Sequence, residues 1–239
     1  MRGSWLGIVL LVVLLGAGGR ALWVWLDRPI ERVSVGGDLQ YVSASYLQNH
    51  MAPLMRGKTW LSVDLGDLRH RAKRIGWLAE VSVSREWPNA LRFELVEQRP
   101  VARWNDDELL NEEGEPFDIG QVTPPDGLPD LAGPDDSGKE VLNYLEKLQG
   151  RFDTLGVEVT QLRLEARGAW RLQLDDSVWI MLGRNDRDAR LARLTAAWQR
   201  QLGSQASQIR YIDLRYPNGV AVAWHGETDT DSLNGDEGS

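Results

Sequence analysis

The chain opens with an almost unbroken apolar run at residues 5–26, in which Arg20 is the only charged residue. At a rise of about 1.5 Å per residue, a helix of this length crosses a hydrocarbon layer of about 30 Å. Arg20 lies near one end, where its long side chain can reach the headgroups. Trp5, Trp23 and Trp25 stand where interfacial aromatic residues gather. The run therefore predicts a transmembrane helix at 5–26.

A cleaved signal peptide is the alternative interpretation of the same run. Its apolar region would be residues 6–15, with cleavage near residues 17–19. We favour the uncleaved helix because apolar residues resume after Arg20 and because the run is longer than the usual signal of about 7–15 apolar residues. Residues 1–4 would then form a short cytoplasmic stub. Basic residues flank the run on both sides, so charge alone does not set the orientation.

Composition excludes several classes of function. The formal net charge is −8, and no basic stripe with interleaved aromatic residues is present, which argues against nucleic acid as a partner. Hydrophobic residues make up 42% of the chain, enough for a packed core. Cysteine is absent, which excludes disulfides, thiolate nucleophiles and cysteine-based metal sites.

Two domains are expected after the apolar run, at residues 29–99 and 100–225, and the fold class is α+β. In the first domain the apolar periodicity predicts the order β-α-α-β-β. Its elements are a strand at 30–35, a helix capped by Ser43 or Ser45, a helix after Asp64, and strands at 79–85 and 91–96.

The second domain is expected to be an antiparallel β domain with two helices. Its expected elements are short strands around a polar turn at 112–114, a helix at 141–155, strands at 159–165, 170–174 and 179–182, a helix at 188–202 and a closing hairpin at 211–224. Residues 226–239 are polar and acidic, and we expect a disordered tail there.

No catalytic, cofactor or metal site is predicted. The three histidines, His50, His70 and His225, have no metal-binding spacing. The carboxylates at 106–108 and 112–115 flank a predicted turn, where solvated charge is the usual reason for such clusters. The hydrolase, metalloprotease and P-loop motifs are absent.

The closing hairpin is the strongest candidate for a binding site. Residues 220–224 form an edge strand that contains neither charge nor proline, the features that usually protect an edge from pairing. Small residues at Ala221 and Ala223 leave room for another backbone, so we expect a partner strand to add here. A tail or loop that masks the edge is the alternative. The expected contact residues of the hairpin are Arg215, Tyr216, Asn218, Gly219, Val220, Ala221, Val222, Ala223 and Trp224.

Five segments together resemble the FtsQ/DivIB family of bacterial cell-division proteins, in its gammaproteobacterial form. They are residues 77–104 ("WLAEVSVSREWPNALRFELVEQRPVARW"), 128–134 ("LPDLAGP"), 182–186 ("LGRND"), 190–194 ("RLARL") and 211–224 ("YIDLRYPNGVAVAW"). The resemblance covers nearly all of the chain after the apolar run.

The resemblance implies a POTRA domain at 29–99 and the family's β domain at 100–225. It implies a non-enzymatic, single-pass inner-membrane scaffold of the divisome at the septum, with a cytoplasmic N-terminus and a periplasmic C-terminal domain. Through the β domain it would bind FtsB and FtsL, and it would link early and late cell-division proteins, including other divisome membrane proteins. Arg167 would pair with an acidic residue of the partner; the alternative for Arg167, as for Arg184, is a solvated loop arginine.

Two other functions remain as alternatives. One is a POTRA-containing accessory protein of outer-membrane assembly or secretion, and the other is a periplasmic enzyme.

Within the first domain, the residues expected to build the fold are Trp77, Val81, Val83, Trp87 and Pro88.

Overall fold

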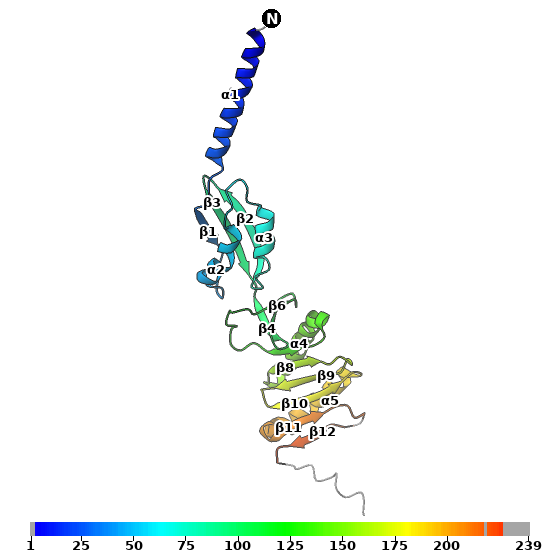
Figure 1. Cartoon of the computed structure of the whole chain (residues 1–239). Helices are drawn as coiled ribbons and strands as arrows, with labels where there is room; N and C mark the ends of the chain where they lie inside the picture. Colours follow the sequence, from blue (N-terminus) through cyan, green and yellow to red (C-terminus); the bar gives the residue numbers. More distant parts are fainter. Residues whose placement is uncertain (1–2, 218, 227–239) are drawn as a thin grey trace, which may run out of the picture. The chain divides into compact units, whose positions relative to one another are not determined.

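The computed structural model describes residues 3–217 and 219–226, and the chain divides into two compact units (Figure 1). The first unit runs as far as Gln98 and also contains Asp118–Pro124. The second unit contains Arg99–Phe117 and the chain from Pro125 onward. Asn218 and, apart from Gly226, the tail expected to be disordered lie outside the described residues.

The first unit begins with helix α1 (Gly3–Leu26). Its segment Gly7–Leu26 has a mean hydropathy of 2.0, and none of that segment is buried against protein. The helix is therefore long and apolar enough to cross a membrane, as the sequence predicts.

A three-stranded sheet and two helices follow α1. They are β1 (Arg32–Gly36), α2 (Ala44–Met55), α3 (Leu65–Ala72), β2 (Leu78–Glu86) and β3 (Ala90–Glu97). The strand order is β1-β3-β2, with β1 parallel and β2 antiparallel to β3. The expected β-α-α-β-β order is confirmed, and so are two helix caps. The Ser43 hydroxyl accepts from the Tyr46 N–H, and the Asp64 carboxylate accepts from Gly66 N–H at 2.8 Å.

Trp77 is the centre of the core of this unit. Its side chain is 0% exposed, its ring lies 5.3 Å from that of Tyr41, and its Nε1 donates to the Ile119 carbonyl at 2.7 Å. Val81 is also buried, as expected. Trp87 is 65% exposed, so the expectation that it builds the core is wrong. The reason is local: β2 ends at Glu86, and Trp87 stands in the turn, past the alternation of the strand.

The second unit contains a nine-stranded sheet with the order β12-β11-β10-β9-β8-β7-β4-β5-β6. Its strands are β4 (Pro100–Trp104), β5 (Glu108–Asn111), β6 (Pro116–Asp118), β7 (Asp130–Ala132), β8 (Val159–Leu164), β9 (Trp170–Leu174), β10 (Val178–Gly183), β11 (Ile209–Asp213) and β12 (Ala221–Trp224). The two expected helices are present as α4 (Gly138–Phe152) and α5 (Arg187–Arg200), accompanied by the 3-10 turns η1 (Asp135–Ser137), η2 (Asp153–Leu155) and η3 (Leu202–Gln208).

The sheet is mixed, so the expectation of a purely antiparallel domain is wrong. The pairs β4–β7, β7–β8 and β10–β11 are parallel. Parallel neighbours need a crossover connection. Helix α4 lies in the crossover from β7 to β8, and helix α5 lies in the crossover from β10 to β11. Alternating hydrophobicity gives the faces of a strand but not its direction, so the sequence pattern could not distinguish these pairings.

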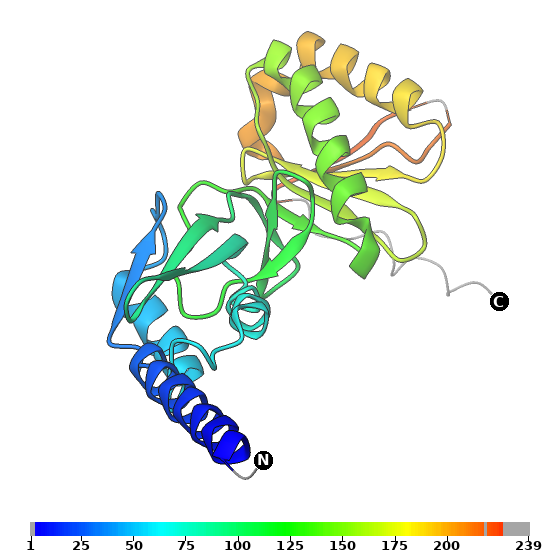
Figure 2. The ribbon, with the colours of Figure 1, turned by 90° about the horizontal axis from the view of Figure 1, so that it is seen from above.

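Helices α4 and α5 lie on the same face of this sheet (Figure 2). Their buried side chains, among them Leu148 and Leu194, form one core with Leu172, Ile180 and Ile212 of the strands. Among the described residues no helix covers the opposite face of strands β8–β12. That leaves β12 with one packed face and one open face.

Candidate functional site: the terminal strand and the loops beside it

Strand β12 is the end strand of the nine-stranded sheet. It pairs antiparallel with β11, with Val222 opposite Ile212 and Ala221 opposite Asp213. Within the part of the chain that the structure describes, no strand pairs with its other side. In a strand at the end of a sheet, backbone groups that face away from the neighbouring strand can form a ladder with another strand.

The two faces of β12 have different roles. Val222, with Val220 and Trp224, packs against the core beneath the helices. Ala221 and Ala223 lie opposite Asp213 and Tyr211 on the helix-free face. Apolar packing therefore fixes the strand on one face, while the other face carries only methyl groups.

The loop before β12 is held by two arginines of α5. Arg190 donates from Nη1 to the Leu182 carbonyl at 2.7 Å and from Nη2 to the Arg215 carbonyl at 3.4 Å. Arg193 donates from Nη2 to the Tyr216 carbonyl at 3.2 Å. The bond from Arg190 to the Leu182 carbonyl joins the "LGRND" segment to the "RLARL" segment. The first ends β10, and the second fixes the loop that leads to the edge strand.

Gly183 makes the approach of Arg190 possible. Its φ is +78°, a conformation that residues with side chains rarely adopt. A Cβ at this position would lie 2.5 Å from Arg190 Nη1 and 3.2 Å from Arg215 Cγ. A side chain here would thus displace the arginine that holds the loop.

Asp213 and Arg215 form the ion pair that ends β11. The Asp213 carboxylate is buried, and it accepts from the Arg215 N–H at 2.9 Å, from Nε at 3.0 Å and from Nη2 at 2.7 Å. The hydrogen bond from the Arg215 side chain lowers the pKa of Asp213 below its usual value. The bond to the Arg215 N–H is local, and it turns the chain out of the sheet.

The turn at Asp213 corrects the predicted position of Tyr216. Simple alternation places Tyr216 on the face of Ile212 and Leu214, which are both buried. In the structure β11 has already ended, and the Tyr216 side chain is 57% exposed. It is a large aromatic surface beside the start of the edge strand, and such side chains are common interface anchors.

Arg167 and Arg184 lie at the same end of the sheet as Arg215. Arg167 is exposed in the turn between β8 and β9, where the Gly168 N–H donates to the Glu165 carbonyl at 2.7 Å. Arg184 follows β10, and its Nε would lie 3.7 Å from a Cβ at Gly168. Strands β8, β10 and β11 run in the same direction, so all three carboxyl ends meet there. The fold thus gathers exposed arginines beside Tyr216, a clustering that sequence spacing does not reveal.

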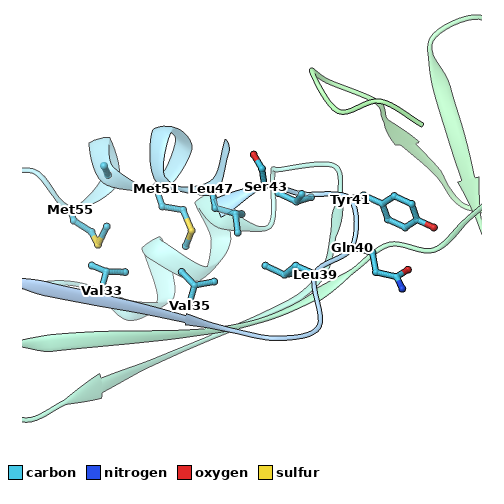
Figure 3. Close-up of a pocket in the computed structure, with 11 residues that line it drawn as sticks. Val33, Val35, Leu39, Gln40, Tyr41, Ser43, Leu47, Met51 and Met55 are labelled. Atoms are coloured by element: carbon cyan, nitrogen blue, oxygen red, sulfur yellow. The ribbon is translucent and has the colours of Figure 1, made fainter. Parts of the chain in front are cut away.

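The first unit carries a separate apolar groove of about 920 Å³ between β1 and α2 (Figure 3). Val33 and Val35 of β1 point towards Met51 and Met55 of α2. The two valines are 40% and 44% exposed, although they alternate as a core face should. Strand β1 is an edge of its sheet, so the groove adjoins a second strand edge that sequence analysis did not identify.

Glu97 holds the loop at one end of this groove. Its carboxylate is buried at the end of β3 and accepts from three successive backbone N–H groups: Gln40 at 2.6 Å, Tyr41 at 3.2 Å and Val42 at 2.7 Å. Three convergent donors form an anion-binding concavity for the carboxylate. Glu97 therefore fixes the connection from β1 to α2.

Comparison with known proteins gives consistent matches to both units. A family model described as "Cell division protein FtsQ/DivIB, C-terminal" matches residues 102–215, and a model described as "POTRA domain, FtsQ-type" matches residues 28–98.

Curated relatives match over most of their length. The "Cell division protein FtsQ" of Hahella chejuensis is 35% identical over 84% of this chain and 71% of its own. The protein of the same name from Vibrio cholerae is 33% identical over 95% of this chain and 89% of its own. The "Cell division protein FtsQ" of Coxiella burnetii is 33% identical over 82% of this chain and 80% of its own. A solved structure, POTRA1-2 of the periplasmic domain of Omp85 from Anabaena, overlaps 62% of this chain and 94% of its own at 14% identity, but its TM-score of 0.26 is too low to bear on function.

Proposed function

This chain belongs to the FtsQ/DivIB family of bacterial cell-division proteins, and from that premise we propose that it is a non-enzymatic scaffold of the divisome. It would span the inner membrane once through α1, with the N-terminus in the cytoplasm and both units in the periplasm. There it would bind FtsB and FtsL through the second unit, and it would link early and late division proteins, other membrane proteins among them, at the septum.

The membrane placement rests on α1, which is apolar and has none of the segment Gly7–Leu26 buried against protein. A reporter enzyme that is active only outside the cytoplasm, fused after Trp224, should be active. A cytoplasmic reporter fused at the same point should be inactive. The reverse result would refute the proposed orientation.

The observation that carries the proposed binding mode is the edge position of β12. A segment of FtsB would pair with the free side of β12, and main-chain hydrogen bonds would supply much of the affinity. Tyr216 would add side-chain contact at the start of the strand. The exposed arginines Arg167, Arg184 and Arg215 would attract an acidic segment of the partner. Trp224 would contribute less directly, since part of its side chain already packs against the core.

Tyr216→Ala tests the side-chain contribution. The residue is exposed, so its removal should leave folding unchanged. Loss of an interface anchor costs about 2 kcal/mol or more, which is about a 30-fold weaker affinity for FtsB. Lys147→Ala is the matched control: Lys147 is exposed on α4, on the other side of the sheet from the open face. Equal affinities of the two variants would remove Tyr216 from the interface.

Backbone methylation of the partner tests strand addition itself. A peptide from FtsB is synthesised with one N-methyl group at each position in turn and is titrated against the full chain. In an added strand only every second N–H faces β12, so affinity should fall at alternate positions. A flat profile, or one with helical spacing, would show that the partner does not bind as a strand.

A further inference from the structure

Three segments of the first unit meet where α1 ends. The Trp60 N–H donates to the Arg28 carbonyl at 2.8 Å, and the Leu61 N–H donates to the Asp27 carboxylate at 3.2 Å. A β-bridge joins Pro29 to Thr59. The loop between α2 and α3 is therefore hydrogen-bonded directly to the last residues of α1 and the turn after it.

The turn between β2 and β3 is fixed to the same loop. Trp60 Nε1 lies 3.2 Å from both the Glu86 and the Ala90 carbonyls, which are the two ends of the turn. Arg85 donates from Nε to the Trp60 carbonyl at 2.7 Å and from Nη2 to the Val63 carbonyl at 2.6 Å. The turn thus has a fixed position next to the end of α1.

Trp87 lies at the tip of this turn and is 65% exposed. Its ring centroid lies 6.4 Å from that of Trp25, which belongs to the last turns of α1 and is itself 52% exposed. Tryptophan is an unusual residue to leave in water, but it is common at the level of lipid headgroups, where its apolar ring and its N–H are both satisfied.

The charges around this tip suit a lipid surface. Arg28, Arg56 and Lys58 are exposed, and the last two line one hollow together with Pro29. The nearby carboxylates have partners within the protein. Asp27 accepts from Leu61, Glu31 accepts from Asn89 at 2.7 Å, and Glu86 pairs with Arg92 at 2.8 Å. Among the described residues these three cations form no ion pair, although Arg28 donates from Nε to the Trp25 carbonyl at 3.1 Å, so their charges can face headgroup phosphates.

We propose that the turn carrying Trp87 inserts into the headgroup layer of the membrane that α1 crosses, so that the first unit rests on the lipid surface. This inference rests on the proposed membrane span. The occupant is the bilayer itself: Trp87 and Trp25 enter the interface together, and Arg28, Arg56 and Lys58 contact lipid phosphates. The first unit is then held at a set height and tilt, and α1 is not its only attachment.

The test uses the full chain, labelled with 5-fluorotryptophan and reconstituted in a bilayer of lipid alone. The Trp87 fluorine signal is assigned by its loss in Trp87→Phe. Two paramagnetic agents are compared, a nitroxide on the lipid headgroup and a gadolinium chelate in the water. Trp23 in α1 is the membrane reference, and Trp179 on the helix-free face of the second unit is the aqueous reference.

The ratio of lipid to aqueous broadening decides the outcome, since burial in protein affects both agents alike. The ratio for Trp87 should be several-fold higher than that for Trp179 and close to that for Trp23. A ratio for Trp87 equal to that for Trp179, with Trp23 still broadened by lipid, would overturn this inference and leave the membrane span intact. If the ratio for Trp23 also equals that for Trp179, the result would overturn both the proposed membrane span of α1 and this inference.

Discussion

Replacing Glu97 with alanine should strongly destabilise the first unit. The carboxylate is only 9% exposed and accepts three backbone hydrogen bonds from Gln40, Tyr41 and Val42. Hydrogen bonds to a charged group are worth about 1.5–3 kcal/mol each, and a buried donor left without a partner costs about 1–3 kcal/mol.

The three donors do not contribute equally, because their exposure differs. Gln40 is exposed and Tyr41 is half-buried, so water can replace the carboxylate at the first donor and in part at the second. Val42 is 4% exposed, and its N–H stays without a partner unless the loop moves. The expected net loss is about 3 kcal/mol, a large part of the 5–15 kcal/mol that stabilises a typical domain. Glu97→Gln keeps one acceptor oxygen and should lose less.

Hydrogen exchange followed by mass spectrometry suits this test, because it reports each unit separately. Peptides that cover residues 37–56 should exchange faster in Glu97→Ala, by a factor of about 100 for a loss of about 3 kcal/mol. Glu94→Ala is the matched control on the same strand. Glu94 is half exposed and pairs with Arg92 at 3.3 Å, so its removal should change stability by less than about 1 kcal/mol. Equal protection in the two variants would refute the role of Glu97.

Three further predictions follow from single contacts. Trp77→Ala should lower the stability of the first unit by about 3–5 kcal/mol, whereas Trp87→Ala should leave its melting temperature almost unchanged, since only the first ring is buried. Arg167→Glu should weaken FtsB binding by a factor of about 30 or more without affecting circular dichroism, since a broken interface pair costs about 2–5 kcal/mol. Because Arg215 lowers the folded-state pKa of Asp213 below its ordinary value, their pair stabilises the fold fully above the pKa of the unfolded chain, and this stability is lost as the pH falls through the lower folded-state pKa. Asp213→Asn should therefore be less stable at neutral pH and should lose less stability on acidification below about pH 4, as measured by urea unfolding.

Local signals made the helices and the first unit predictable. Asp64 caps α3 as its position before an apolar stripe predicts, and the periodicity of residues 141–155 and 188–202 gives α4 and α5 to within a few residues. These features depend on contacts between neighbours in the chain, so the sequence displays them directly.

Features that depend on distant residues could not be predicted in the same way. Alternation does not reveal that β10 and β11 are parallel. Nor does it reveal that Arg190 reaches from α5 to the Arg215 carbonyl, 25 positions away, or that Glu97 meets Val42 across 55 positions. At the candidate site, the alternating pattern predicted the edge strand, but it did not predict the hydrogen bonds from Arg190 and Arg193 that hold the loop before the strand.

The order of strands in the second sheet has a consequence for how the binding edge is made. From β7 to β12 each strand lies beside the strand that precedes it in the chain. As the chain emerges in chain order, each new strand finds its template already formed, and the sheet can grow outwards in one direction. Strand β12 is the latest strand of this series in chain order, so a chain that has not emerged that far ends its sheet at an earlier strand and lacks the proposed binding edge. A partner strand added at β12 would be the next step of the same growth, supplied by another chain.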